Sequence, residues 1–204
     1  MAANIRHEEE MADQLAYPLR VAAGRVDVMT RPAEEAITLD LAREHCRIDG
    51  DDEDVLLKGN IVAAREALEA ALSRPLLPQE CRVRVDSFPS DRILLWNDVI
   101  EITDVSYSDE AGVRQTLPPA AYRVMDRAYL VSRKSFPYGE DVQVRFRCGA
   151  FETPDAVPES LVAWMLLQLG TLSAHRESEL DGTVSSLSED FTNRLIARHA
   201  IVSI

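Results

Sequence analysis

The chain is short of lysine and glycine, and each shortage argues against a class of function. Only Lys58 and Lys134 are lysines among the 22 basic residues, and the net charge of the 204 residues is −13. Because a surface that binds nucleic acid needs a basic patch, this composition excludes the simplest kind of nucleic-acid binding. The eight glycines form no GxGxxG, GxxxxGKS or GxSxG pattern, so neither a phosphate-binding loop nor a nucleophile elbow is indicated.

Cysteines and long apolar runs are scarce as well. Cys46, Cys81 and Cys148 lie far apart and form no CxxC or Cys/His ligand pattern, so the sequence predicts neither a disulfide framework nor a zinc site. Residues 161–172, the longest apolar stretch, are too few to cross a bilayer. The first ten residues lack the apolar region of a signal peptide. We therefore expect a soluble protein of a reducing compartment that makes no membrane contact.

The acidic run at residues 49–54 is the most prominent candidate for a metal site, but its spacing does not fit a calcium loop. Counted from Asp49, an EF-hand loop needs glycine at the sixth position and glutamate at the twelfth, where this chain has Asp54 and Ile61. The four histidines form no HExxH motif. The sequence thus predicts no catalytic, cofactor-binding or metal-binding residue, and it favours a helix-capping turn for the acidic run.

Apolar residues recur at helical spacing in three segments, near residues 39–47, 53–72 and 158–176. Thr38 is a suitable N-cap for the first helix. In that helix Leu41, His45 and Ile48 are expected to share one face. The spacing in the second helix predicts a buried stripe made of Leu57, Ile61, Ala64, Leu68 and Leu72.

The third helical segment is apolar on almost every side. Such a helix is either central in a core or shared with a neighbouring subunit. The composition of the segment leaves both roles open. Its candidate residues for the core or for a subunit interface are Leu161, Trp164, Met165 and Leu169.

Between the second and third helices the hydrophobic period changes to two. Apolar and polar residues alternate in residues 81–86 and 142–147, which predicts strands. Residues 109–112 predict a hairpin loop, and a slip of the alternation between Ile102 and Val105 predicts a β-bulge. The sequence therefore predicts an α+β fold: a small helical bundle with an inserted antiparallel β module at about residues 80–148, and extended N- and C-terminal arms.

We divide the chain into an N-terminal arm (1–36), a helical core (37–79 and 154–177), the β module (80–150), and a loop with a docking tail (178–204). The charge follows this division, because residues 1–54 carry 14 acids and 6 bases whereas the β module carries 11 acids and 10 bases. The tail from residue 191 onward has two arginines, several apolar residues and no acid, which is typical of a docking element. The candidate docking residues are Phe191, Arg194, Leu195, Ile196, Arg198, Ile201 and Val202.

Three stretches of the sequence carry a resemblance to a known family. The first is ITLDLAREHCRID at residues 37–49, followed by DDEDVLL at 51–57. The second is AALSRPLLPQ at residues 70–79. The third begins with VPESL at residues 157–161 and continues through the apolar helix to Glu177. In this order, the three stretches resemble the head–tail connector (adaptor, or head-completion) proteins of long-tailed bacteriophages and of related gene transfer agents.

This resemblance implies a virion protein without enzymatic activity or cofactor, located in the neck and assembled in the host bacterial cytoplasm. It implies a ring, typically of twelve subunits, that lies under the portal protein and extends the DNA channel. The C-terminal segment is implied to grip the portal, and the opposite face to receive a stopper or tail-completion protein. DNA would pass without specific binding.

An acidic channel would repel the phosphates of the passing DNA, which is the converse of binding by counterion release. Some of the acidic residues are therefore expected to line the channel. The candidates are Glu8, Glu9, Glu10, Asp51, Asp52, Glu53 and Asp54.

Two other classes of function remain open at this stage. One is a non-viral intracellular adaptor that uses the β module to bind a peptide or a protein. The other, which ranks well behind, is a metal hydrolase built on the acidic run at residues 49–54.

Overall fold

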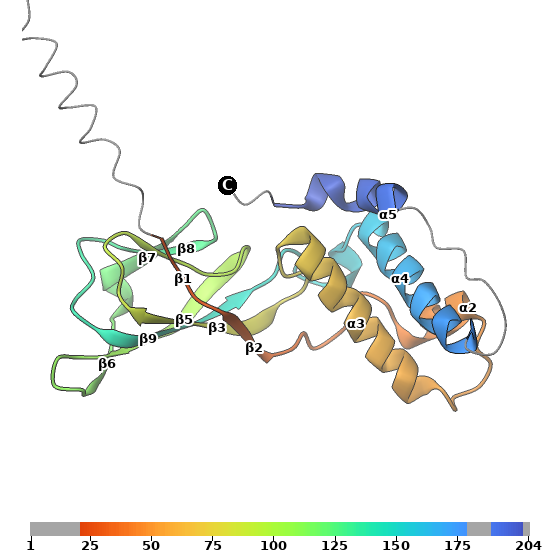
Figure 1. Cartoon of the computed structure of the whole chain (residues 1–204), viewed down its shortest axis with the longest axis horizontal. Helices are drawn as coiled ribbons and strands as arrows, with labels where there is room; N and C mark the ends of the chain where they lie inside the picture. Colours follow the sequence, from red (N-terminus) through yellow and green to blue (C-terminus); the bar gives the residue numbers. More distant parts are fainter. Residues whose placement is uncertain (1–20, 179–188, 202–204) are drawn as a thin grey trace, which may run out of the picture.

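The computed structural model describes residues 21–178 and 189–201, and it confirms the α+β fold class. The molecule is elongated, with a helical core at one end and a β module at the other (Figure 1). Two separate clusters of buried hydrophobic residues lie inside these two lobes. The chain passes between the lobes after α3 and again before α4, so the β module is inserted into the helical core.

The helical core contains α2 (Leu39–Cys46), α3 (Asp54–Leu72), α4 (Glu159–Ser178) and α5 (Glu189–Ile196). Thr38 caps α2 as expected, because its hydroxyl accepts a hydrogen bond from the backbone N–H of Leu41 at 3.2 Å. The predicted stripe of α3 is confirmed. All five of its residues are buried, namely Leu57, Ile61, Ala64, Leu68 and Leu72.

The face predicted for this helix is not the one that α2 buries, apart from Ile48 just beyond its end, which packs against the core. Leu41 and His45 are exposed, whereas Ala42 is completely buried and Cys46 packs against the core. Successive residues of a helix point about 100° apart, so an error of one position turns the helix away from the neighbour it contacts. The side chain at the closest approach of α2 to the core is a small alanine, which carries little weight in a hydrophobic pattern.

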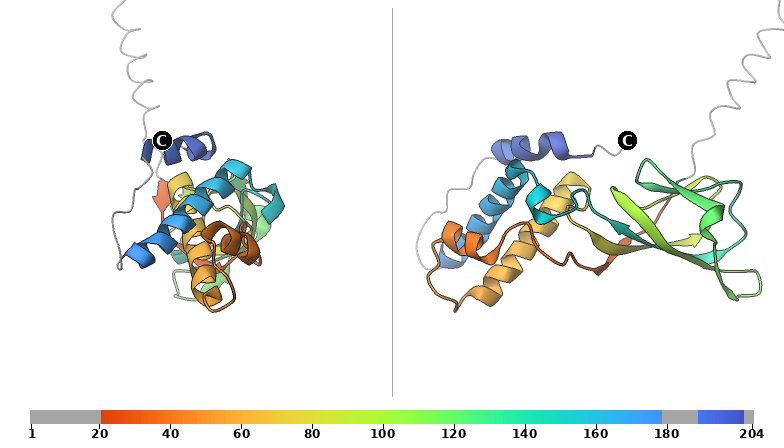
Figure 2. Two further views of the ribbon diagram at one scale, coloured as in Figure 1. Left: turned by 90° about the vertical axis from the view of Figure 1, so that its right-hand side faces the viewer. Right: turned by 180° about the vertical axis from the view of Figure 1, so that it is seen from behind.

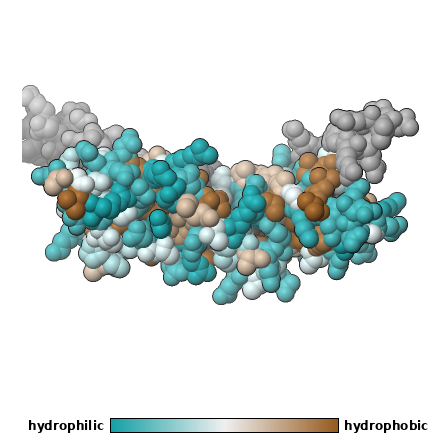
Figure 3. Space-filling view, turned by 90° about the horizontal axis from the view of Figure 1, so that it is seen from below, coloured by the Kyte–Doolittle hydropathy of each residue, from teal (hydrophilic) through white to brown (hydrophobic). Residues whose placement is uncertain are grey.

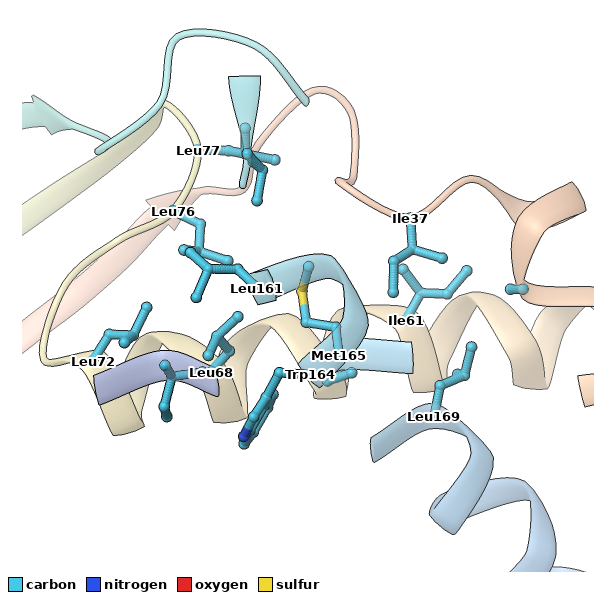
Figure 4. Packing of buried hydrophobic residues seen from close by; sticks show 14 of the residues in the cluster. Ile37, Ile61, Leu68, Leu72, Leu76, Leu77, Leu161, Trp164, Met165 and Leu169 are labelled. Atoms are coloured by element: carbon cyan, nitrogen blue, oxygen red, sulfur yellow. The ribbon is translucent and has the colours of Figure 1, made fainter. Parts of the chain in front are cut away.

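Helix α4 passes through the middle of the helical core. Its residues Leu161, Trp164, Met165 and Leu169 are buried and lie against α3, as Figure 4 shows. These are among the residues that the sequence assigned to a core or to a subunit interface. In this structure they pack inside their own subunit.

The β module is built from two sheets that enclose the second hydrophobic cluster. One sheet has the strand order β1-β4-β8-β7 and the other β2-β3-β9-β5-β6. The strands are β1 (Val21–Ala23), β2 (Val26–Thr30), β3 (Gln79–Ser87), β4 (Arg92–Leu94), β5 (Val99–Ser108), β6 (Arg114–Thr116), β7 (Tyr122–Met125), β8 (Tyr129–Ser132) and β9 (Glu140–Cys148). Three short 3-10 turns, η1 (Pro119–Ala121), η2 (Pro154–Ala156) and η3 (Ala197–His199), complete the elements.

The alternation of the sequence places the inward-facing residues of this module correctly. Cys81 and Val83 of β3 and Val142, Val144 and Phe146 of β9 are buried, while the residues between them are more exposed. The predicted bulge in β5 is also confirmed, since the register of β5 with β9 shifts between Ile102 and Asp104.

Two strands come from residues that the sequence analysis assigned to the N-terminal arm. Strand β1 pairs with β4 in one sheet, and β2 pairs with β3 at the edge of the other. Gly24 lies where the chain crosses between the sheets, and a Cβ at this position would lie only 2.0 Å from the carbonyl oxygen of Arg84. The close approach of the two backbones therefore requires glycine at this position.

The C-terminal arm is not extended throughout, because its residues 189–196 form α5. Figure 2 shows that α5 and η3 lie across one end of α3 and α4, on the side from which the chain continues toward the β module. Within the described ranges, no helix combines the length and the apolar character that crossing a membrane requires.

Candidate functional site

The residues that the structure describes contain no group of three or more His, Cys, Asp or Glu side chains arranged to hold a metal ion. The remaining candidates are the charged and apolar surfaces and the junction between the two lobes.

The acidic turn between α2 and α3 is held in place by an ion pair. The guanidinium of Arg43 donates to both carboxylate oxygens of Asp54 at 2.6 Å and also contacts Asp40 at 2.9 Å. These contacts, the hydrogen bond to Asp54 first, raise the pKa of Arg43. Asp54 thus has a structural partner, whereas Asp51 and Asp52 in the same turn are exposed.

The predicted helix-capping role of the acidic run is only partly seen. Helix α3 begins at Asp54 after the N-cap residue Glu53, whose side chain makes no capping hydrogen bond to the helix. Asp54 instead connects the first turn of α3 to α2 through Arg43. Among the other predicted channel acids, Glu8, Glu9 and Glu10 lie outside the described residues.

A hollow of about 430 Å³ lies beside this turn, lined in part by Ile48, Asp52, Leu56 and Ser173. Val55, the neighbour of Leu56, has 86% of its surface exposed. Seen from below, as in Figure 3, hydrophobic surface gathers within largely hydrophilic surroundings at the helical end of the molecule. The tip of the helical core therefore combines negative charge with exposed apolar side chains.

The tail lies on the helical core of its own subunit. Ile196 is buried and Leu195 packs against the same hydrophobic cluster, while Arg194 and Arg198 are exposed. The N–H of Ile201 donates to the carbonyl oxygen of Leu72 at 3.1 Å. Phe191 belongs to α5, but its side chain lies outside the described residues, and so does Val202.

The tail reaches the junction between the two lobes through Arg74. This arginine donates from Nε and Nη2 to the carboxylate of Asp98 at 2.7 and 2.9 Å, and from Nη1 to the carbonyl oxygen of His199 at 3.1 Å. His199 also lies 3.3 Å from the hydroxyl of Ser160, and its pKa is lowered, by burial first and then by the charges of Arg198 and Arg74.

A second charged group joins α3 to the start of the β module. Glu69, only 3% exposed, accepts hydrogen bonds from Arg65 Nη1 at 2.7 Å, from the N–H of Leu76 at 2.8 Å and from Gln79 Nε2 at 3.1 Å. Burial raises the pKa of Glu69, and the charge of Arg65 opposes that rise. Arg65 also donates to Glu35 at 2.8 Å.

The sequence analysis missed both charged groups of the junction. A signal for the group around Glu69 exists in the sequence, because Arg65 and Glu69 are four residues apart and each follows a residue of the buried stripe. Arg74 and Asp98 belong to different elements, and nothing in their local sequence indicates that they meet.

The β module exposes apolar side chains at one sheet edge. Strand β2 is an edge strand, and its residues Val28 and Met29 are about half exposed. An unpaired strand edge with apolar side chains is a common place for protein contact. Exposed apolar surface thus occurs on both lobes, at β2 and at the tip around Val55.

Residues 36–107 match the family model described as "Phage gp6-like head-tail connector protein". No curated protein matches the chain. Fourteen chains of solved structures match it. One, from the neck of an empty GTA particle computed with C6 symmetry, has a TM-score of 0.70 and 22% identity, with 88% of this chain and 97% of that chain covered.

Two further matches come from native particles. A chain from the virion of a native gene transfer agent (GTA) particle has a TM-score of 0.68 and 21% identity, with 88% of this chain and 96% of that chain covered. A chain from the neck of a native GTA particle computed with C12 symmetry has a TM-score of 0.66 and 20% identity, covering 88% and 97%. These matches establish the fold, and together with the family match they confirm the resemblance to head–tail connector proteins that the sequence indicated.

Proposed function

We propose that this chain is a structural virion protein, a head–tail connector that forms a ring under the portal and extends the DNA channel. The ring would provide the docking surface for the stopper or the tail proteins. The observation that carries the proposal is that the fold covers 97% of a chain from the neck of a GTA particle, while residues 36–107 match the connector family. The role requires neither a catalytic residue nor a cofactor.

A ring of identical subunits needs a heterologous contact, in which one face of a subunit meets a different face of the next. One of the neck structures with this fold was computed with C12 symmetry, which supports a ring of twelve subunits. The exposed apolar residues at β2 and at the tip around Val55 are available for such a contact. The buried residues of α4 are not, because they already pack inside the subunit.

Asp51 and Asp52 are the described acids best suited to line the channel. Both are exposed, and the ion pair of Asp54 with Arg43 holds the turn that carries them. Negative charge on a channel wall repels DNA phosphates and so favours sliding over binding. Glu8, Glu9, Glu10 and Glu53 remain candidates from the sequence.

The tail is our candidate for contact with the portal. It combines exposed arginines with the apolar residues Leu195, Ile196 and Ile201. Arginine forms planar, multiply hydrogen-bonded pairs with carboxylates, which suits it to protein interfaces. To reach a portal with these apolar side chains, the tail has to leave its present position on the helical core.

The decisive experiment is electron microscopy of the purified protein mixed with its cognate portal protein. A closed ring coaxial with the portal is expected. A variant that ends at residue 190 should remain folded, as judged by circular dichroism, and should fail to bind the portal. A chain that stays monomeric and unbound in the presence of portal would contradict the connector role.

The channel acids are tested separately in assembled particles. The double variant D51N/D52N removes two charges from the turn, and E110Q/E152Q removes two from exposed positions in other parts of the chain. We expect the first pair alone to change the rate of DNA ejection. Equal ejection rates for the two variants would exclude the turn as channel wall.

A further inference from the structure

The contacts of the tail converge on the place where the two lobes are joined. Asp98, in the β module, is 8% exposed and binds Arg74 with both carboxylate oxygens. The backbone carbonyl of Asp98 accepts from the N–H of Gly149 at 3.0 Å, and Asn97 donates to the carbonyl of Ser73 at 2.7 Å. The contacts of Arg74 and Ser73 fix the end of α3 against the loop between β4 and β5, and the bond from Gly149 ties that loop to the end of β9.

The tail completes this junction. Leu72 is the last residue of α3, so its carbonyl lacks a partner within the helix, and the N–H of Ile201 supplies one. Arg74 has one guanidinium nitrogen left after binding Asp98, and it donates from this nitrogen to the carbonyl of His199. The positive charge of Arg74 also suits the negative end of the α3 dipole.

The described residues of the tail make a small set of contacts with the rest of the subunit. Besides the hydrogen bonds to Leu72 and Arg74, they are the contact of His199 with Ser160 and the packing of Ile196, Leu195 and Ala200 against the hydrophobic cluster. Arg74 takes part in both the junction and the tail contact. A change in its position therefore acts on both.

We propose that residues 197–201 form an intramolecular latch, and that Arg74 couples this latch to the junction between the lobes. With the latch closed, the tail is held on its own subunit and the lobes keep the observed orientation. Opening the latch frees the apolar tail residues and loosens the junction together. The use of this opening to deliver the tail to the portal rests on the proposed function; the coupling itself does not.

Native-state hydrogen exchange followed by NMR tests the coupling without any partner. Asp98→Asn weakens the hold on Arg74 without touching the tail, so exchange of the Ile201 amide should accelerate about tenfold or more. The matched control is Glu101→Gln, which removes the partner of Arg147 in the same β module and should leave Ile201 unchanged. The amide of Val144, inside the β9 ladder, is the reference for global unfolding.

Because coupling between two sites is reciprocal, removing the tail must in turn loosen the junction. Deleting residues 197–204 should accelerate exchange of the Ala150 amide, which donates across the junction to the carbonyl of Pro75 at 3.0 Å, more than that of Val144. If Asp98→Asn accelerates Ile201 no more than Val144, or no more than the control does, the coupling is refuted. Should Asp98→Asn not fold, Asn97→Ala, which removes the donor to the carbonyl of Ser73 and leaves the contacts of the tail in place, is the substitute.

A reversible cross-link tests the use of the latch. Ser160→Cys with His199→Cys, in a Cys46→Ser background, places one thiol on each side of this contact, where a reducible bis-maleimide can join them. The cross-linked protein should not bind the portal, and reduction of the linker should restore binding. Equal portal binding by the cross-linked and the reduced protein would overturn the latch. Loss of portal binding in both forms and in the Cys46→Ser parent would contradict the proposed tail–portal contact, and the hydrogen-exchange experiment would then decide whether the latch exists.

Discussion

Replacing Glu69 by alanine should be one of the most damaging single changes in this protein. Its carboxylate accepts three hydrogen bonds from groups that are themselves buried: the guanidinium of Arg65, the N–H of Leu76 and the amide of Gln79. Glu69→Ala leaves all three donors without this acceptor. Glu35 remains as a partner for Arg65, so the guanidinium does not lose its whole counter-charge.

The magnitude follows from the three donors. A buried donor that loses its partner costs about 1–3 kcal/mol, and breaking a buried ion pair costs about 3–5 kcal/mol. Glu35 reduces the second figure, and relief of the desolvation of Glu69 itself, which is what raises its pKa, offsets part of the total. We therefore expect the free energy of unfolding to fall by about 3–4 kcal/mol.

The control lies three residues away. Glu66 contacts Arg31 and Arg65 only at 3.5 and 3.8 Å, and its side chain is 53% exposed. Such surface pairs contribute about 0–1 kcal/mol, so Glu66→Ala should change the stability by less than about 1 kcal/mol. Both substitutions remove one negative charge from α3, and they differ mainly in burial.

Urea unfolding measured by tryptophan fluorescence is a suitable assay, because each lobe contains one tryptophan. Trp164 reports on the helical core and Trp96 on the β module, so Trp96→Phe and Trp164→Phe backgrounds follow the two lobes separately. Glu69 joins the lobes, and we expect both probes to report the loss of stability. If the free energies of unfolding of Glu69→Ala and Glu66→Ala lie within about 1 kcal/mol of each other, this account of the junction is refuted.

Three further expectations concern the backbone, the tail and the core. Gly149→Ala should lower the melting temperature by several degrees in a thermal scan, because the added Cβ would lie 2.7 Å from a backbone nitrogen. The pKa of His199 is lowered in the folded chain, so folding favours the neutral imidazole. The stability that neutral His199 contributes is therefore present above its ordinary pKa of 6.5, and it is lost as the pH falls through the pKa that His199 has in the folded chain. Exchange of the Ile201 amide, measured between pH 7.5 and 5.5 and corrected for intrinsic rates, should therefore show weaker protection at the acid end, and a His199→Gln variant should lack this trend. Leu161→Ala should cost about 2–5 kcal/mol in urea unfolding and Leu172→Ala, at an exposed position of the same helix, less than about 1 kcal/mol; equal losses would contradict the assignment of Leu161 to the subunit core.

Features that depend on a single helix or strand can be predicted from the sequence. The stripe of α3 follows from helical spacing, because one side of a long amphipathic helix has to be buried. The alternation in β3 and β9 determines which residues point into the module, and the slip near Ile102 indicates the bulge. Strand β2 also had a readable signal, since Val26 and Val28 alternate with Asp27, but a five-residue strand within a segment interpreted as an arm was overlooked.

The tertiary structure decides which surface each apolar element packs against. Composition alone left α4 as core or interface, and only its packing against α3 assigns Leu161 and its neighbours to the subunit core. The sequence predicts a docking role for the apolar, basic tail, and the structure places the tail on the end of α3 beside Arg74.

The sequence by itself determined α2, α3, α4, the inserted β module and the resemblance to connectors, because these depend on spacing along the chain and on short sequence motifs. Only the tertiary structure determined which charges pair between elements. Arg43 with Asp54, Arg65 with Glu35, and Arg74 with Asp98 and the tail depend on how elements meet in space. A net charge of −13 says how much acid the chain carries. The fold decides which carboxylates hold the lobes together and which, like Asp51 and Asp52, face the solvent.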